Sequence, residues 1–218
     1  MNKQALAWMA AVAASVALIS VFAFDRGLAL AVHHSGIESL AFIVRLREFF
    51  DALTGRGLAS RYGSLSQLLI GVCLILAGLL WALARRANPV ARALIFTGIV
   101  QIGTIEAVAN IKDVFGRLRP YQIIASDDWN HVWFAGGNSF PSGHVAFFWG
   151  LFLPLAYLYP RYRIALLAVP LFIGLERIDE NVHFLSDVLG SITVAALVTL
   201  AAALAFGRWI RPAVVATP

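Results

Sequence analysis

The chain has 218 residues, of which 60% are hydrophobic and only 13% are charged, whereas soluble domains usually carry about 25% charged residues. The mean hydropathy of +0.79 and several long apolar runs argue against a soluble domain and indicate one integral membrane domain. The net charge of +5 does not indicate nucleic-acid binding, because the arginines cluster at the ends of apolar runs, as topology signals do.

Six apolar segments follow one another, and none alternates apolar and polar residues as membrane β-strands do. The sequence therefore predicts an all-α fold, in which six transmembrane helices form a single membrane-embedded domain over residues 1–218. The predicted helices are Ala5–Phe24, Leu65–Ala84, Ala93–Ile111, Val145–Tyr159, Ile164–Leu175 and Phe184–Phe206.

Three of these segments need comment. A signal peptide is the competing interpretation of the first, since Lys3 precedes it, but the apolar region of a signal peptide has only about 7–15 residues. The fourth and fifth are short for a bilayer of about 30 Å. We therefore expect the fourth helix to begin before His144 and the fifth to extend to Ile178 or beyond.

The basic residues predict the orientation of the bundle. With the N-terminus in the cytoplasm, one set of basic residues lies inside: Lys3, Arg85, Arg86, Arg92, Arg161, Arg163, Arg208 and Arg211. Lys112, Arg119 and Arg177 then share the extracytoplasmic face. The loop from Asp25 to Ser64 would lie outside as well, and its five arginines go against the rule.

An amphipathic helix is predicted over Ile37–Leu53, between the first and second spans. Its apolar face holds Leu40, Ile43, Val44 and Phe50, and Glu38, Arg45, Glu48 and Asp51 lie away from that face. Such a helix rests in the headgroup layer or packs on the end of the bundle. In both cases we expect it to form one wall of an entrance for a lipid.

The stretch Lys112–Pro120 (KDVFGRLRP) places Lys112 and Arg119 seven residues apart at the end of the third predicted helix. Pro120 disfavours helical geometry at Arg119. A guanidinium can bind two phosphate oxygens at once, and the lysine adds a point charge. Both residues are candidate phosphate ligands, and solvated anchors at a helix end are the alternative.

The run from Gly136 to His144 (GGNSFPSGH) precedes the fourth predicted helix. Ser142 suits an N-cap, and Gly143 allows the backbone to approach a ligand closely. Backbone amides at a helix start bind anions, and His144 in the first turn can pass a proton to a leaving oxygen. A capped helix with an interfacial histidine is the alternative.

The stretch Arg177–Asp187 (RIDENVHFLSD) contains His183 and Asp187, which share a face if both lie on the sixth helix. A carboxylate bonded to one imidazole nitrogen fixes the tautomer and leaves the other nitrogen as base or nucleophile. A buried salt bridge without chemistry is the alternative. Ionisable groups at a membrane boundary are costly, however, and are usually functional.

Together, Lys-x6-Arg-Pro, Pro-Ser-Gly-His and Arg-x5-His-x3-Asp resemble the signature of the type-2 phosphatidic acid phosphatase superfamily, which includes membrane lipid phosphatases and vanadium haloperoxidases. The motifs span Lys112–Asp187, and the six-helix layout extends the similarity to nearly the whole chain. The chain is most similar to the membrane lipid phosphatase branch, such as bacterial phosphatidylglycerol phosphate and undecaprenyl pyrophosphate phosphatases. A haloperoxidase would be expected to be soluble.

The resemblance implies a role for each motif residue. His183 would be the nucleophile that forms a phosphohistidine, Asp187 would orient and activate it, and His144 would protonate the leaving oxygen and then assist water. Five residues would hold the phosphate oxygens: Lys112, Arg119, Ser142, Gly143 and Arg177. Three fixed cations can stabilise the charge that Mg²⁺ stabilises elsewhere, so we expect no metal and no other cofactor.

One position departs from the family pattern. The third motif often has serine before the arginine, where this chain has Glu176. Asp179 and Glu180 follow, so an acidic cluster lies beside a site that must attract an anion. These carboxylates either pair with Arg177 or contact a cationic headgroup or sugar hydroxyls. We expect Glu176 or Asp179 to shape substrate choice.

The sequence thus predicts a hydrolase that removes phosphate from a lipid phosphate or pyrophosphate in a bacterial inner membrane, with its site facing the periplasm. Candidate substrates are undecaprenyl pyrophosphate, phosphatidylglycerol phosphate, phosphatidic acid and phosphorylated lipid A, and we expect headgroup selection in the helix-poor stretch Tyr121–Asn138. The expected partners are the substrate and membrane lipids, with no nucleic acid and an unknown oligomeric state. A phosphotransferase and a non-enzymatic lipid-binding or transport protein are the alternatives.

Overall fold

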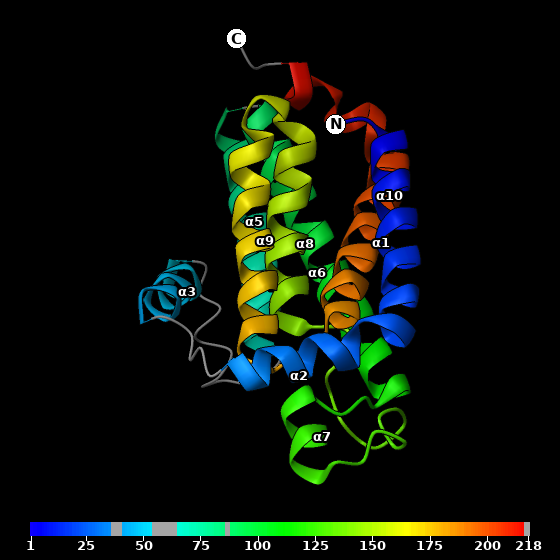
Figure 1. Cartoon of the computed structure of the whole chain (residues 1–218). Coiled ribbons are helices and arrows are strands. Elements are labelled where there is room, and N and C mark those ends of the chain that lie inside the picture. The colour runs from blue at the N-terminus through cyan, green and yellow to red at the C-terminus, as the bar shows by residue number, and fades with distance from the viewer. Residues whose placement is uncertain (36–40, 54–64, 86–87, 216–218) are drawn as a thin grey trace.

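The computed structural model describes residues 1–35, 41–53, 65–85 and 88–215. Every regular element in these ranges is helical, so the described part of the chain confirms the all-α prediction. Figure 1 shows a bundle of long helices with the N-terminus and the end of α10 together at one end of the bundle, and with α2 and α7 at the other.

The bundle consists of α1 (Lys3–Ala23), α5 (Leu65–Arg85), α6 (Pro89–Phe115), α8 (Gly143–Leu158), α9 (Arg163–Asp179) and α10 (Leu185–Val215). The shorter elements are α2 (Asp25–Ser35), α3 (Ala41–Leu53), α7 (Pro120–Ser126) and the 3-10 turn η2 (Pro160–Tyr162). Within the described residues, four helical segments are long and apolar enough to cross a membrane: Lys3–Ala23, Gln67–Ala84, Pro89–Ser126 and Leu185–Ile210. Six spans therefore remain a prediction, since α8 is apolar but shorter and α9 is not among these four.

The helix boundaries agree with the sequence prediction in two places. As expected, α8 begins before His144 and α9 extends beyond Ile178. The amphipathic helix is described from Ala41 onward as α3, and the first part of the predicted range, residues 37–40, lies outside the described residues.

Two details concern the regions beside the motifs. The helix α10 begins at Leu185, so the condition under which His183 and Asp187 would share a helix face is not met. The stretch Tyr121–Asn138 is largely non-helical, as expected, although it opens with α7. This short helix begins with Pro120 at its first position, which suits the fixed proline backbone, and the Gln122 side chain accepts a hydrogen bond from the Arg119 amide at 2.9 Å.

The helix α2 was also not predicted. It follows α1 after the single residue Phe24 and lies across the end of the bundle, where it contacts α9 and α10 (Figure 1). Asp25 is its first residue, and a carboxylate there is favoured by the helix dipole. The chain thus turns sharply at the end of α1 and covers the end of the bundle.

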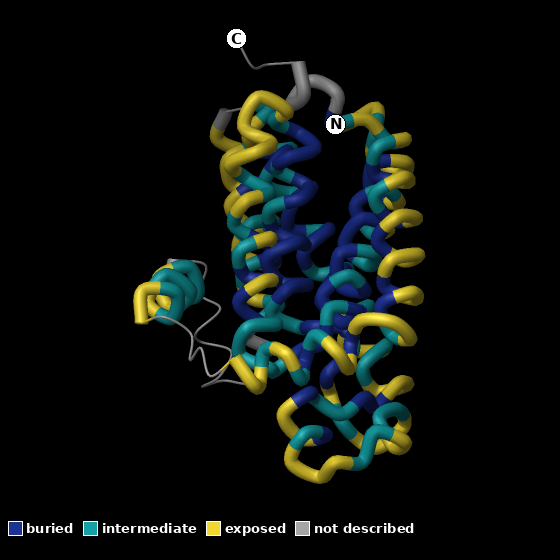
Figure 2. The backbone as a smooth tube through the Cα atoms, in the orientation of Figure 1, coloured by how far each residue is buried: buried dark blue, intermediate teal, exposed yellow. Residues whose placement is uncertain are grey.

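The centre of the bundle is formed by α6, α8 and α10, which contact one another. On the outside of these three, α5 packs on α6, α9 on α8, and α1 on α10. Figure 2 shows buried residues on the inner helices and exposed residues along the outer sides of α1 and α9. The exposed outer residues include large apolar side chains such as Leu18, Leu80 and Ile164, which suit a lipid environment.

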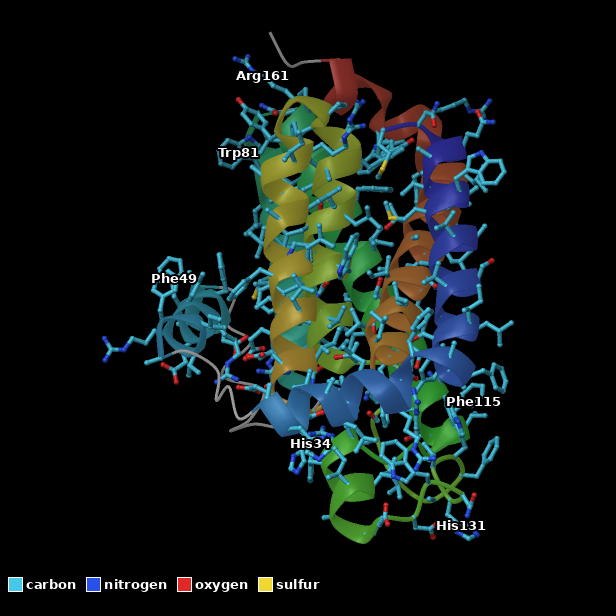
Figure 3. The ribbon with its side chains drawn as sticks, viewed as in Figure 1. His34, Phe49, Trp81, Phe115, His131 and Arg161 are labelled. Atoms are coloured by element: carbon cyan, nitrogen blue, oxygen red, sulfur yellow. The ribbon has the colours of Figure 1, made fainter. Side chains whose placement is uncertain are left out.

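The direction of the helices brings the motif regions together. The last turns of α6 and α9 and the first turns of α8 and α10 lie at the end of the bundle that carries α2 and α7, opposite the N-terminus (Figure 1). Figure 3 shows Arg161 at the other end of the bundle, near Trp81. Lys112 and Arg177, in the last turns of α6 and α9, therefore lie at the end opposite to Arg161, in agreement with the predicted separation of these residues.

Glycines allow α5 and α6 to pack closely. A Cβ atom added at Gly98 on α6 would lie 2.5 Å from the backbone oxygen of Gly71 on α5, which is closer than any real contact. A Cβ atom at Gly78 would lie 2.8 Å from the backbone oxygen of Ala91. Small residues at such interfaces let two backbones approach each other.

We predict that Gly98→Ala lowers the thermal stability of the detergent-solubilised protein, by about 1–3 kcal/mol, because the helices must move apart to fit the methyl group. Thermal unfolding in detergent measures this change. Gly27→Ala on α2 is the matched control, since a Cβ atom there meets nothing within 4 Å, and it should be neutral or slightly stabilising. An equal effect of both substitutions would contradict the proposed close contact.

Candidate active site

A cavity of about 280 Å³ lies where the motif regions meet. Its walls come from α5, α6, α8 and the loops before α7, α8 and α10: Gln67, Ile105, Val108, Ala109, Lys112, Arg119, Asn138, Gly143, His144 and His183. Five of the eight residues that the motifs predict therefore line one cavity. The other three, Ser142, Arg177 and Asp187, are buried nearby.

Asn138 connects the two cations of the first motif. Lys112, in the last turn of α6, donates a hydrogen bond to the Asn138 backbone oxygen. Arg119 donates from Nε to the Asn138 side-chain oxygen at 3.1 Å. The backbone of Arg119 is extended, with φ −83° and ψ 154°, as expected before Pro120. The two positive charges are thus held on one wall of the cavity by a residue that the sequence analysis did not select.

The second motif forms the start of α8. Ser142 occupies the N-cap position as predicted, but its side chain makes no capping hydrogen bond, and its buried Oγ has no hydrogen-bond partner in the described part of the chain. The amides of Gly143 and His144 belong to the first helical turn, where no intrahelical acceptor exists. These amides and the positive end of the helix dipole favour an anion in the cavity.

The contacts of His183 define its tautomer. Its Nδ1 atom lies 3.5 Å from Asp187 Oδ2 and 3.4 Å from Ser139 Oγ. Ser139 donates its own hydroxyl proton to Asp187 Oδ2 at 2.5 Å, so it can only accept from the imidazole. The proton therefore belongs on Nδ1, and Nε2 keeps the lone pair that a nucleophile or base requires.

Asp187 is held from several directions. Besides Ser139, it accepts hydrogen bonds from the Phe184 amide at 2.8 Å and from Arg117 Nη1 at 2.6 Å. The Arg117 guanidinium also bonds Asp25 at 2.7 Å. Asp187 is fully buried and Arg117 nearly so, and a buried carboxylate needs such partners.

The sequence analysis missed several of these residues. Arg117 lies inside the quoted first motif, and Asn138 and Ser139 lie inside the glycine-rich run before α8. Their position within the motif stretches was the available signal. Asp25 carried no comparable signal, since it stands alone at the end of the first apolar segment.

The third-motif arginine is engaged by carboxylates. Arg177 donates from Nε to Glu176 at 2.5 Å and from Nη2 to Glu180 at 2.6 Å. Arg47 on α3 pairs with the same two carboxylates, at 2.9 Å from Glu176 and 2.6 Å from Glu180. Glu176 and Glu180 thus pair with Arg177, as one of the two alternatives expected, and contact of the acidic cluster with a headgroup or sugar stays a prediction. Arg177 itself does not line the cavity.

The helix α3 reaches the site through its polar residues. Asp51 Oδ2 lies 3.4 Å from His144 Nε2, although the helical pattern placed Asp51 away from the packing face. Phe50 packs against Phe172 of α9, with ring centroids 6.2 Å apart. Phe42 and Phe49 are exposed, and Figure 3 shows Phe49 pointing away from the bundle. One side of α3 therefore packs on the bundle, which is one of the two expected arrangements, and contact of its exposed apolar side with the headgroup layer stays a prediction.

A second pocket, of about 500 Å³, lies among α2, α3, α9 and the start of α10. Most of its wall is apolar, and two acidic residues contribute to it: Leu28, Val32, Ile43, Phe172, Leu175, Glu176, Ile178, Asp179 and Leu185. Glu176 therefore belongs both to this pocket and to the ion-pair cluster around Arg177.

A family model described as the PAP2 superfamily matches residues 86–211, which is more than half of the 218 residues. The chain belongs to the PAP2 superfamily. The matched PAP2 segment contains all three motifs, from Lys112 to Asp187, and excludes α1, α2, α3 and α5.

Two curated proteins are similar in sequence to part of the chain. The Lipid A 1-phosphatase of Rhizobium johnstonii is 33% identical over 101 residues, which cover 45% of this chain and 41% of that protein. The Lipid A 1-phosphatase of Rhizobium etli is 30% identical over 119 residues, which cover 53% of this chain and 50% of that protein. The matches thus span half or less of either relative. No solved structure matches the chain.

We predict that His183 makes the stability of this PAP2 protein depend on pH. Burial lowers the pKa of His183 from 6.5 to about 4, with Lys112 and Arg119 adding to the shift and Asp187 opposing it. Between these pH values the unfolded chain binds a proton that the folded chain does not bind, so stability falls as the pH falls from 6.5 toward 4, by up to roughly 3 kcal/mol.

Melting temperatures in detergent, measured from pH 7.5 down to the acid limit of the protein, test this prediction. His183→Asn should give a flatter profile over this interval, because asparagine does not titrate. Superimposable profiles for the two proteins would show that the imidazole is not held neutral by burial.

Proposed function

We propose that the chain is a membrane lipid phosphatase that hydrolyses a lipid phosphate or pyrophosphate through a phosphohistidine on His183, without a metal ion. The observation that carries this proposal is one cavity lined by His144, His183, Lys112 and Arg119 together. Membership of the PAP2 superfamily and the names of the two relatives support it.

The first step is attack on the phosphate. Lys112, Arg119 and the first amides of α8 bind the phosphate oxygens and lie next to His183 in the cavity. Because Nδ1 of His183 carries the proton, Nε2 forms the new bond to phosphorus. The bond from phosphorus to the lipid oxygen breaks, and His144 gives this oxygen a proton. Positioning and charge stabilisation carry most of the catalysis in phosphoryl transfer.

The second step releases phosphate. His144, now neutral, accepts a proton from a water molecule, and the water oxygen bonds to phosphorus as the bond to His183 breaks. Inorganic phosphate then leaves, and both histidines return to their starting states. Arg177 would assist as a third cation only after it exchanges Glu176 or Glu180 for a phosphate oxygen, since both carboxylates engage it in the structure.

Among the candidate substrates we place phosphorylated lipid A first, because two relatives are named Lipid A 1-phosphatase. Undecaprenyl pyrophosphate, phosphatidylglycerol phosphate and phosphatidic acid remain candidates with the same chemistry at the phosphate. We further propose a bacterial inner membrane location with the site facing the periplasm. The basic residues at the opposite end of the bundle support this orientation.

We also propose that α3 forms one wall of the lipid entrance. Arg47 of α3 pairs with Glu176 of the acidic cluster. Asp51 of α3 contacts the proposed catalytic residue His144. The largely apolar pocket beside Glu176 and Asp179 provides space for part of a lipid next to charged groups. This arrangement supports a role for these two acids in substrate choice.

Phosphate release in EDTA tests the activity. The purified protein in detergent should release phosphate from at least one lipid phosphate with EDTA present. His183→Ala should abolish release, and His144→Ala should reduce it by about 10²- to 10⁴-fold, the usual contribution of a positioned acid. His34→Ala is the control and should keep the activity, because His34 is an exposed histidine on α2 that does not line the cavity. Release that survives His183→Ala would reject the nucleophile.

Substrate choice is tested with a panel of lipid phosphates. Glu176→Ala removes one partner of Arg177 and Arg47 and changes the charge beside the second pocket, so the relative rates among lipid A phosphates, phosphatidylglycerol phosphate and phosphatidic acid should shift. Asp179→Ala should shift the relative rates as well, because it removes an acidic residue from the wall of the second pocket. Relative rates that match the unsubstituted protein in both variants would exclude these residues from substrate choice.

A further inference from the structure

Asp25 is a buried carboxylate far from the motifs in sequence. It is the first residue of α2 and only 3% exposed, and it lies outside the segment that the PAP2 family model matches. Its oxygens accept hydrogen bonds from the Ser20 hydroxyl at 2.7 Å, from the Ser186 amide at 3.1 Å, and from Arg117 Nη2 at 2.7 Å. Its contacts thus join the end of α1 to the start of α10.

The Arg117 guanidinium joins Asp25 to the catalytic carboxylate. Its Nη2 atom bonds Asp25, while its Nη1 atom bonds Asp187 at 2.6 Å and Ser186 Oγ at 2.6 Å. The rings of Trp133 and Phe184 lie 4.3 Å and 4.0 Å from the guanidinium carbon. A planar group bonded along its edge and covered by aromatic rings has little freedom to rotate.

Sharing one cation between two carboxylates changes the charge of the cluster. Arg117 with Asp187 alone would be neutral, but Arg117 with Asp25 and Asp187 carries a net charge of about −1 at neutral pH. This charge faces the protonated Nδ1 of His183. When Nε2 of His183 bonds to phosphorus, the imidazole ring becomes cationic, and a net negative neighbour stabilises that cation in a buried site.

We propose that Asp25, acting through Arg117, is a positioning residue for the Asp187–His183 pair: it fixes the guanidinium that orients Asp187 and keeps this cluster negative when His183 becomes cationic. The proposal rests on the proposed function for the role of His183 as a nucleophile. Asp25 does not line the phosphate cavity, so its effect should fall on bond formation by His183 and not on phosphate binding.

Two anions separate these effects without substrate turnover. Inorganic phosphate needs only the cations and amides of the cavity, whereas orthovanadate can also accept a bond from the His183 nitrogen and so resembles the transferred group. In Asp25→Asn, the orthovanadate affinity and kcat should fall by about 10- to 100-fold, as is common for outer partners of a reacting group, while the phosphate affinity stays unchanged.

Two further variants make the test decisive. Thr199→Val is the control for loss of a buried polar group, because the Thr199 hydroxyl donates to the Ala195 oxygen within α10, away from the cavity. This variant should keep both affinities. Arg117→Lys keeps the positive charge but cannot bond both carboxylates in one plane, so it should repeat the pattern of Asp25→Asn even if the latter does not fold. Unchanged orthovanadate affinity in Arg117→Lys would overturn the proposal.

The outcomes also separate this proposal from the proposed function. If no lipid phosphate is hydrolysed but orthovanadate binds tightly and loses affinity in His183→Ala and Asp25→Asn, the phosphatase assignment fails and the positioning role stands. If Asp25→Asn lowers only the melting temperature and keeps kcat and both anion affinities, Asp25 is a structural residue and the positioning role is refuted. Orthovanadate binding that is independent of His183 would refute it as well.

Discussion

The arrangement of the site depends on one buried carboxylate, that of Asp187 at the start of α10. It receives hydrogen bonds from Ser139 before α8, from the Phe184 backbone and from Arg117 after α6. A buried ionised carboxylate is stable only when its lone pairs are occupied. The segments that supply these donors therefore lie close together around Asp187. Asp187 and Ser139 also contact Nδ1 of His183, which leaves Nε2 unprotonated.

The sequence predicted the helical class, the apolar segments and the motif residues, because apolar runs and charged clusters are local patterns. Five of the predicted site residues line one cavity, and their roles stay predictions. Their partners depend on tertiary structure and could not be predicted in the same way. The role of Ser139 follows from the position of its hydroxyl between Asp187 and His183. The role of Asp25 follows from the course of α2 across the end of the bundle, which brings Asp25 to Arg117 (Figure 1).

Glu176, where the family pattern often has serine, takes part in a cluster of ion pairs. Two arginines and two glutamates form a compact cluster of Arg47, Arg177, Glu176 and Glu180. Opposite charges balance within it, so the positive charge directed at the phosphate cavity comes from Lys112, Arg119 and the start of α8. Glu176, which stands where the family pattern often has serine, therefore belongs to an ion-pair cluster that joins α3 to α9.

The position of Asp25 bears on where this domain can be divided. A fragment cut at the limits of the family match, residues 86–211, would retain every motif residue and most of the central helices. It would lack α1, which covers α10, and the carboxylate that shares Arg117 with Asp187. The unit that keeps the whole cluster of Asp25, Arg117 and Asp187 is thus larger than the unit that the motifs define. Chimeras between relatives should therefore exchange the corner between α1 and α2 together with the first and third motifs.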